Sequence, residues 1–217
     1  MLKHVLIGAA GLAVSALVVA PAEATVVAFD VNTAFSGPTS LGTAPYVRIE
    51  FDDAVAPGFV RMTASAPGIA AEEWVARIDL NMDPALNPSG LTFSNFQILS
   101  GTLLQPLAFL GADQFEADGG GRYDWELQFA VSGGGLTRRF NQGESFSFDL
   151  NGIPGLTANS FNFQSATPAP NGQYPTAVLI QGIGPDMLEG WHSVPEPTAT
   201  SLALIAIGAL AARRRRS

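Results

Sequence analysis

The chain has 217 residues, which is the size of one ordinary domain or of two small ones. It contains no cysteine, two histidines and a single lysine. These counts exclude a disulfide framework, thiolate metal sites and most histidine-cluster or lysine Schiff-base chemistry. The formal charge of −8 argues against a nucleic-acid partner, because phosphates require a basic surface.

The first segment has the pattern of a secretory signal peptide. A basic start precedes an apolar run over residues 5–19, and Ala22 and Ala24 form an Ala-x-Ala cleavage site. We predict that signal peptidase removes residues 1–24, which makes Thr25 the mature N-terminus. The alternative is an uncleaved anchor helix.

Residues 25–184 are predicted to form one exported β-domain. Apolar and polar residues alternate over several short runs, which is the pattern of half-buried antiparallel strands. The runs cover residues 47–52, 74–83, 123–131, 145–150 and 160–164, with flanking strands at 25–31 and 176–180. The alternation changes phase at Ser94-Asn95, where we expect a β-bulge. Gly- and Pro-rich turns separate the runs, so the predicted fold class is all-β, an antiparallel β-sandwich or jelly roll.

Two acids on one predicted strand form a candidate catalytic pair. Asp124 and Glu126 lie two positions apart, so their side chains share a face, and paired carboxylates are what a glycoside hydrolase uses. The alternative is the polar outer face of an ordinary strand. A Ser-His-Asp enzyme is disfavoured, because His192 is the sole histidine after the signal peptide and no Gly-x-Ser-x-Gly elbow occurs.

A loop rich in acids and glycines is the candidate metal site. Asp113, Glu116 and Asp118 precede the glycine run at residues 119–121, and Asp124 follows it. Carboxylates and free carbonyls on a loop suit a calcium ion, although the EF-hand spacing is absent. The alternative is a solvated acidic loop, since Asp and Gly are common turn residues.

The C-terminal region is predicted to be a linker followed by a membrane-directed tail. Residues 185–193 are turn-rich and are interpreted as the linker. Residues 194–217 hold three parts, namely Pro195, Glu196 and Pro197, an apolar stretch at 198–212, and the cluster Arg213, Arg214, Arg215 and Arg216. The apolar stretch would form a short transmembrane helix, and the arginines would set topology by remaining cytoplasmic. The preceding domain would then lie outside, in agreement with the signal peptide.

This tail resembles a PEP-CTERM sorting signal, in which a Pro-Glu-Pro motif, a short apolar helix and terminal arginines follow in that order. The resemblance covers residues 194–217. It implies a Gram-negative source, transient retention in the inner membrane, and processing near Pro-Glu-Pro by an exosortase. It also implies an association with extracellular polysaccharide or biofilm matrix.

The functional expectation follows from these segments together. Residues 25–193 carry six arginines and seventeen acids, a net charge near −11 that favours a soluble exported domain. We expect a non-enzymatic structural protein of the envelope or extracellular matrix, with no cofactor unless the acidic loop binds calcium. The alternatives are a calcium- or glycan-binding module and a carboxylate-dependent glycan hydrolase.

Overall fold

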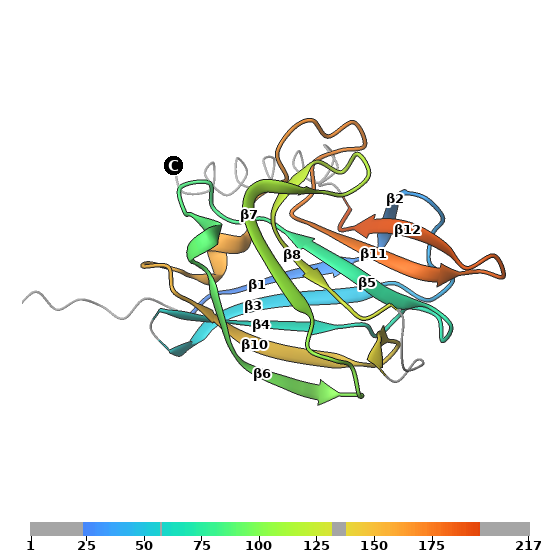
Figure 1. Cartoon of the computed structure of the whole chain (residues 1–217), viewed down its shortest axis with the longest axis horizontal. Coiled ribbons are helices and arrows are strands. Elements are labelled where there is room, and N and C mark those ends of the chain that lie inside the picture. Colours follow the sequence, from blue (N-terminus) through green and yellow to red (C-terminus); the bar gives the residue numbers. More distant parts are fainter. Residues whose placement is uncertain (1–23, 57, 132–137, 196–217) are drawn as a thin grey trace, which may run out of the picture.

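The computed structural model describes residues 24–56, 58–131 and 138–195 (Figure 1). Within these ranges the chain forms β-strands and short 3-10 helices, with no α-helix. The strands are β1 (Val26–Val31), β2 (Thr33–Ser36), β3 (Val47–Ala56), β4 (Phe59–Ser65), β5 (Trp74–Leu80), β6 (Thr92–Ser100), β7 (Leu107–Glu116), β8 (Arg122–Gln128), β9 (Phe140–Asn141), β10 (Ser145–Asn151), β11 (Thr176–Ile183) and β12 (Leu188–Ser193). The 3-10 helices are η1 (Pro88–Gly90) and η3 (Ala158–Phe161).

The strands form two antiparallel sheets that pack as a sandwich (Figure 1). The first sheet has the order β1-β3-β4-β10-β6, and the second has the order β2-β12-β11-β5-β8-β7, with β9 paired to β5. The predicted all-β antiparallel sandwich is therefore confirmed. At one side of the sandwich the sheets end in β6 and β7, which follow one another in the chain.

The core forms because alternate residues of each strand point between the sheets. Phe51 of β3 and Trp125 of β8 are fully buried, and their rings meet edge to face with centroids 6.4 Å apart. Phe161 of η3 stacks on Phe51 at 4.3 Å. The expected bulge is also present, because the pairing of β6 with β10 shifts between Ser94 and Gln97, and Asn95 has φ of 52°.

Strand β5 is more deeply buried than its alternation predicts. Its outward residue Asp79 is 0% exposed, since β5 lies inside the second sheet and that sheet's outer face is partly covered. Ala117, Tyr123 and Ala177 form a second apolar cluster there, against which Trp191 packs. Sequence alternation could not reveal this layer, because it is built from segments distant in the chain.

Two sequence predictions are corrected by the structure. Residues 160–164 do not form a strand, because η3 turns the chain and inserts Phe161 into the core. Residues 185–193 are not a linker, because strand β12 occupies 188–193 and pairs with both β11 and β2. Gly190 and Ser193 are residue types common in turns, although here they belong to a strand.

The predicted signal peptide, apart from Ala24, and the predicted transmembrane helix at 198–212 lie outside the described residues. The described ranges contain no helix with the length and apolarity needed to span a membrane.

Candidate functional site

The β-domain extends up to the predicted sorting motif. Ser193 is buried at the end of β12, where its hydroxyl donates to the carbonyl oxygen of Thr176 and its own carbonyl accepts from Asn32 N at 3.0 Å. Val194 packs against the core, and Pro195 is exposed. The last residue packed against the domain is thus Val194, and the exposed Pro195 follows it directly. Glu196, Pro197 and the arginines at 213–216 lie outside the described residues.

His192 fastens the last strand to the loop that follows β2. Its Nε2 accepts a hydrogen bond from Ser40 N at 3.0 Å, and its Nδ1 lies 3.0 Å from the carbonyl oxygen of Gly190. A carbonyl only accepts and a backbone N–H only donates, so these contacts require a neutral ring protonated at Nδ1. Burial lowers the pKa of His192 below its ordinary 6.5, although Gly190 and Glu73 oppose the shift. The histidine is structural in this geometry.

We predict that His192 weakens the fold under mildly acidic conditions. Below pH 6.5 the unfolded chain takes up a proton that the folded chain refuses, so the free energy of unfolding falls as the pH falls. The slope from one group is at most about 1.4 kcal/mol per pH unit. The measurement is chemical denaturation between pH 7.5 and 5.5.

The control for this prediction is His192→Gln, compared at each pH with the unsubstituted protein. Burial raises the pKa of Asp79 and Asp124, and those groups contribute the opposite slope in both proteins. The difference between the two curves isolates the histidine. Parallel curves would show that His192 does not titrate differently on folding.

The predicted mature N-terminus lies against a carboxylate. Thr25 N donates to Asp53 Oδ1 at 2.6 Å, and Asp53 Oδ2 accepts from Ala158 N at 3.0 Å. Cleavage after Ala24, which is exposed, would leave the α-ammonium of Thr25 beside this carboxylate. Ala22 lies outside the described residues.

The three acids of the predicted calcium site are not brought together. Asp113 lies within β7 and donates its N–H to Asp124 Oδ1 at 3.0 Å, whereas Glu116 lies at the end of that strand. Asp118 accepts a hydrogen bond from the Ser36 hydroxyl and so ties its turn to β2. Across the described ranges no three or more His, Cys, Asp or Glu side chains cluster closely enough to hold a metal ion.

The candidate catalytic pair is engaged in structural contacts. The Asp124 carboxylate accepts from Met82 N at 2.8 Å as well as from Asp113 N, so it joins β8 to the chain after β5. Glu126 is 3% exposed and its Oε2 lies 2.6 Å from Arg77 Nε. The two residues share a strand as expected, but Glu126 is closed off from solvent.

The sequence did not indicate a charge cluster that is centred on Arg77. Its Nε and one terminal nitrogen donate to the two carboxylate oxygens of Asp79 at 2.7 and 2.6 Å. Asp79 lies directly across from Glu126 in the register of β5 and β8, so the Arg77 guanidinium forms ion pairs with both carboxylates. The ring of Trp191 covers it, with the guanidinium carbon 4.9 Å from the ring centroid. Burial raises the pKa of Asp79 to about 7 against the opposing effect of Arg77.

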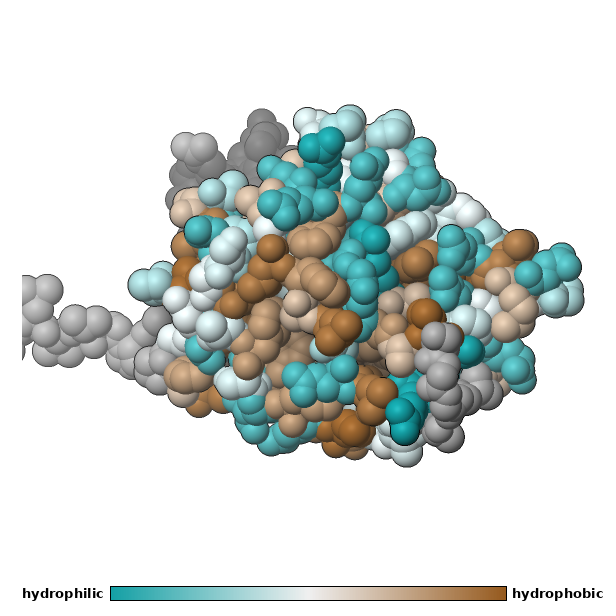
Figure 2. All heavy atoms as spheres, in the orientation of Figure 1, coloured by the Kyte–Doolittle hydropathy of each residue, from teal (hydrophilic) through white to brown (hydrophobic). Residues whose placement is uncertain are grey.

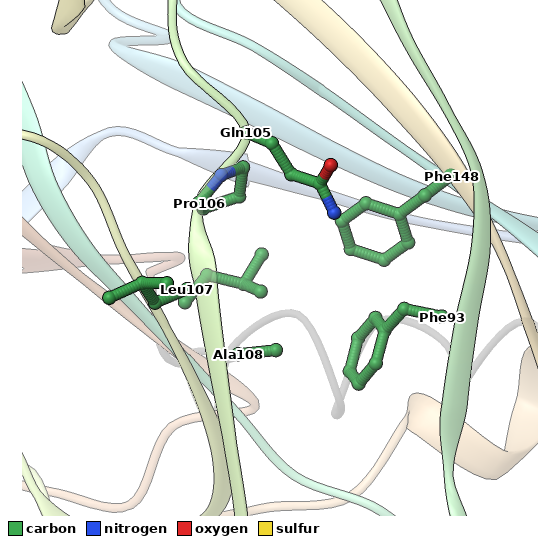
Figure 3. Close-up of a pocket in the computed structure, with 7 residues that line it drawn as sticks. Phe93, Gln105, Pro106, Leu107, Ala108 and Phe148 are labelled. Atoms are coloured by element: carbon green, nitrogen blue, oxygen red, sulfur yellow. The ribbon is translucent and has the colours of Figure 1, made fainter.

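The described surface is hollowed between the edge strands β6 and β7, where apolar residues gather (Figure 2). The cleft has a volume of about 270 Å³. Phe93 of β6 and Phe148 of β10 form one wall, and Gln105, Pro106 and Ala108 face them (Figure 3). The cleft thus lies against the sandwich interior, where Phe148 and Leu127 remain buried. Sequence alternation did not indicate the cleft, because apart from Gln105 and Pro106 its lining residues are ordinary core types.

Comparison with known proteins identifies the tail alone. The model of the PEP-CTERM protein-sorting motif matches residues 193–216. No match was found among curated proteins or among solved structures. The matched segment begins at Ser193, the last residue of β12, so the motif directly follows the domain. The chain therefore carries a PEP-CTERM protein-sorting motif, which implies export and marks it as an exosortase substrate sorted to the cell surface.

Proposed function

We propose that the protein is a non-enzymatic structural component of the cell envelope or of the extracellular, polysaccharide-rich matrix. The sorting motif supplies the route, and the β-sandwich is the part delivered. Signal peptidase and the exosortase are its processing partners, and the inner membrane holds it in transit. After processing, a compact acidic domain remains at the surface or in the matrix.

The observation that carries the non-enzymatic proposal is the engagement of the buried acids. A catalytic carboxylate must reach a substrate, so its oxygens cannot all be committed to the fold. Each buried carboxylate of the described residues accepts from the backbone or from another side chain instead. These acids are Glu73, Asp79, Glu126, Glu144 and Asp149. These five buried carboxylates therefore favour neither the hydrolase nor the calcium-dependent module.

The sorting step is tested by replacing Pro195, Glu196 and Pro197 together with alanine in the producing bacterium. We expect the unsubstituted chain outside the inner membrane, without Arg213–Arg216, and the variant in the inner membrane with these arginines intact. Intact mass and terminal peptides of each cell fraction provide the measurement. Pro185→Ala is the control, because that proline lies outside the motif and should leave processing unchanged.

Two outcomes would contradict the proposal at different points. A variant processed like the unsubstituted chain would show that the tripeptide does not direct the cut. Hydrolysis of host polysaccharide by the purified protein, lost in Glu126→Gln, would replace the structural role with an enzymatic one.

A further inference from the structure

The sandwich leaves both sheets open on one side. Among the described strands, β6 pairs with β10 alone and β7 pairs with β8 alone. Edge strands usually carry charges or prolines that discourage pairing with other chains. Strand β6 has neither, and β7 has no charge before Asp113. The bulge at Asn95 shortens the regular part of β6, so side chains rather than a long new ladder would make most contacts here.

Large apolar side chains lie on β6, on β7 and on the connection between these two strands. Each is between 42% and 64% exposed. We call this set the edge face, and its members are Ile98, Leu99, Leu104, Leu107 and Phe109. Figure 2 shows apolar residues gathered over β6 and β7. The cleft lined by Phe93 and Phe148 adjoins this face through Leu107 and Ala108 (Figure 3). Exposed apolar residues concentrated in this way mark an interaction surface.

The charge distribution indicates what covers the edge face. Residues 84–112 contain no charged residue, yet residues 25–193 have a net charge near −11. Two copies of such a domain repel each other through most of their surfaces, and they meet with least repulsion where the contributing segment carries no acid. A basic partner would instead be attracted to the acidic surfaces elsewhere.

The edge face also suits a two-fold contact. In a symmetric dimer each copy offers the same patch, so the patch must be complementary to itself. Here the edge face combines exposed leucines with an adjoining apolar cleft of about 270 Å³. Contact between two such faces would remove both from water, and burial of apolar area drives association.

We propose that the edge face binds the edge face of a second copy of this chain, forming a two-fold dimer through β6, β7 and the connection between them. The proposal depends on the described domain and not on whether the exosortase cuts the tail. Failure of sorting and failure of dimerisation are therefore separate results.

The first test is sedimentation velocity of the full chain in a mild detergent over a range of protein concentrations. We expect a concentration-dependent dimer, and Leu107→Lys should raise its dissociation constant about tenfold or more, because two like charges would meet in an apolar contact. Leu41→Lys is the matched control, since Leu41 is 68% exposed and Leu107 is 64% exposed. The C-terminal apolar stretch is common to all three proteins, so the difference reports the edge face.

Salt provides a second readout in the same experiment. Screening weakens repulsion between two acidic copies, so raising the ionic strength should strengthen the dimer. A full chain that stays monomeric at every concentration, or a Leu107→Lys dimer as tight as that of Leu41→Lys, would overturn the proposal.

A test that does not rely on the lysine variants uses the absence of cysteine. Leu107→Cys introduces the sole thiol of the chain, and a short bis-maleimide should link two copies through it. Leu41→Cys is again the control and should give little covalent dimer. Equal yields from the two variants would mean random collision and would refute the edge-face contact.

Discussion

Replacing Arg77 with leucine is expected to lower the free energy of unfolding by about 3–5 kcal/mol, because it leaves buried acids without their cation. Asp79 is 0% exposed and Glu126 is 3% exposed, and Arg77 contacts both carboxylates. Neither acid can reach water to recover its lost partner. Chemical denaturation at pH 8 measures the loss.

The pH dependence of this loss distinguishes charge burial from lost packing. Without Arg77 the pKa of Asp79 would rise further, since the guanidinium opposes the effect of burial. An acid with a raised folded-state pKa gains stability as the pH falls through that value, so the Arg77→Leu defect should shrink at pH 5.

A triple variant is the matched control. Replacing Arg77, Asp79 and Glu126 together with leucine removes all three charges and should recover most of the stability. A single variant that loses less than about 1 kcal/mol, or a defect that is equal at pH 8 and pH 5, would contradict the charge-burial account.

Replacing Trp125 with alanine is expected to lower the free energy of unfolding by about 3–5 kcal/mol through loss of packing. Trp125 is 0% exposed, and its ring contacts Phe51, Phe93 and Phe161 between the two sheets. Its removal would leave a cavity next to Phe93, which lines the cleft between β6 and β7. The same denaturation experiment measures the effect.

Trp125→Phe is the informative control. Within the described residues the indole Nε1 of Trp125 has no hydrogen-bond partner, so phenylalanine removes no bond and keeps most of the ring contacts. We expect it to cost under about 1.5 kcal/mol. Equal losses from the phenylalanine and alanine variants would contradict the view that the ring contacts kept by phenylalanine carry the stability.

The sequence alone was sufficient wherever the signal is local. The alternation of Val47, Ile49 and Phe51 with polar residues predicted a half-buried strand, because the side-chain period of a strand is two. The phase change at Ser94-Asn95 predicted the bulge for the same reason. The sorting motif was recognisable because its parts follow one another within 24 residues.

Only the tertiary structure decided which polar residues are buried and which apolar residues are exposed. Asp79 and Glu126 both contact Arg77 because β5 pairs with β8. The sequence of one strand does not determine which strand it pairs with. His192 has a structural role because it lies on β12, which pairs with β11 and β2 and is not a linker. The edge face exists because β6 and β7 end their sheets on the same side, and strand order is a property of the whole chain.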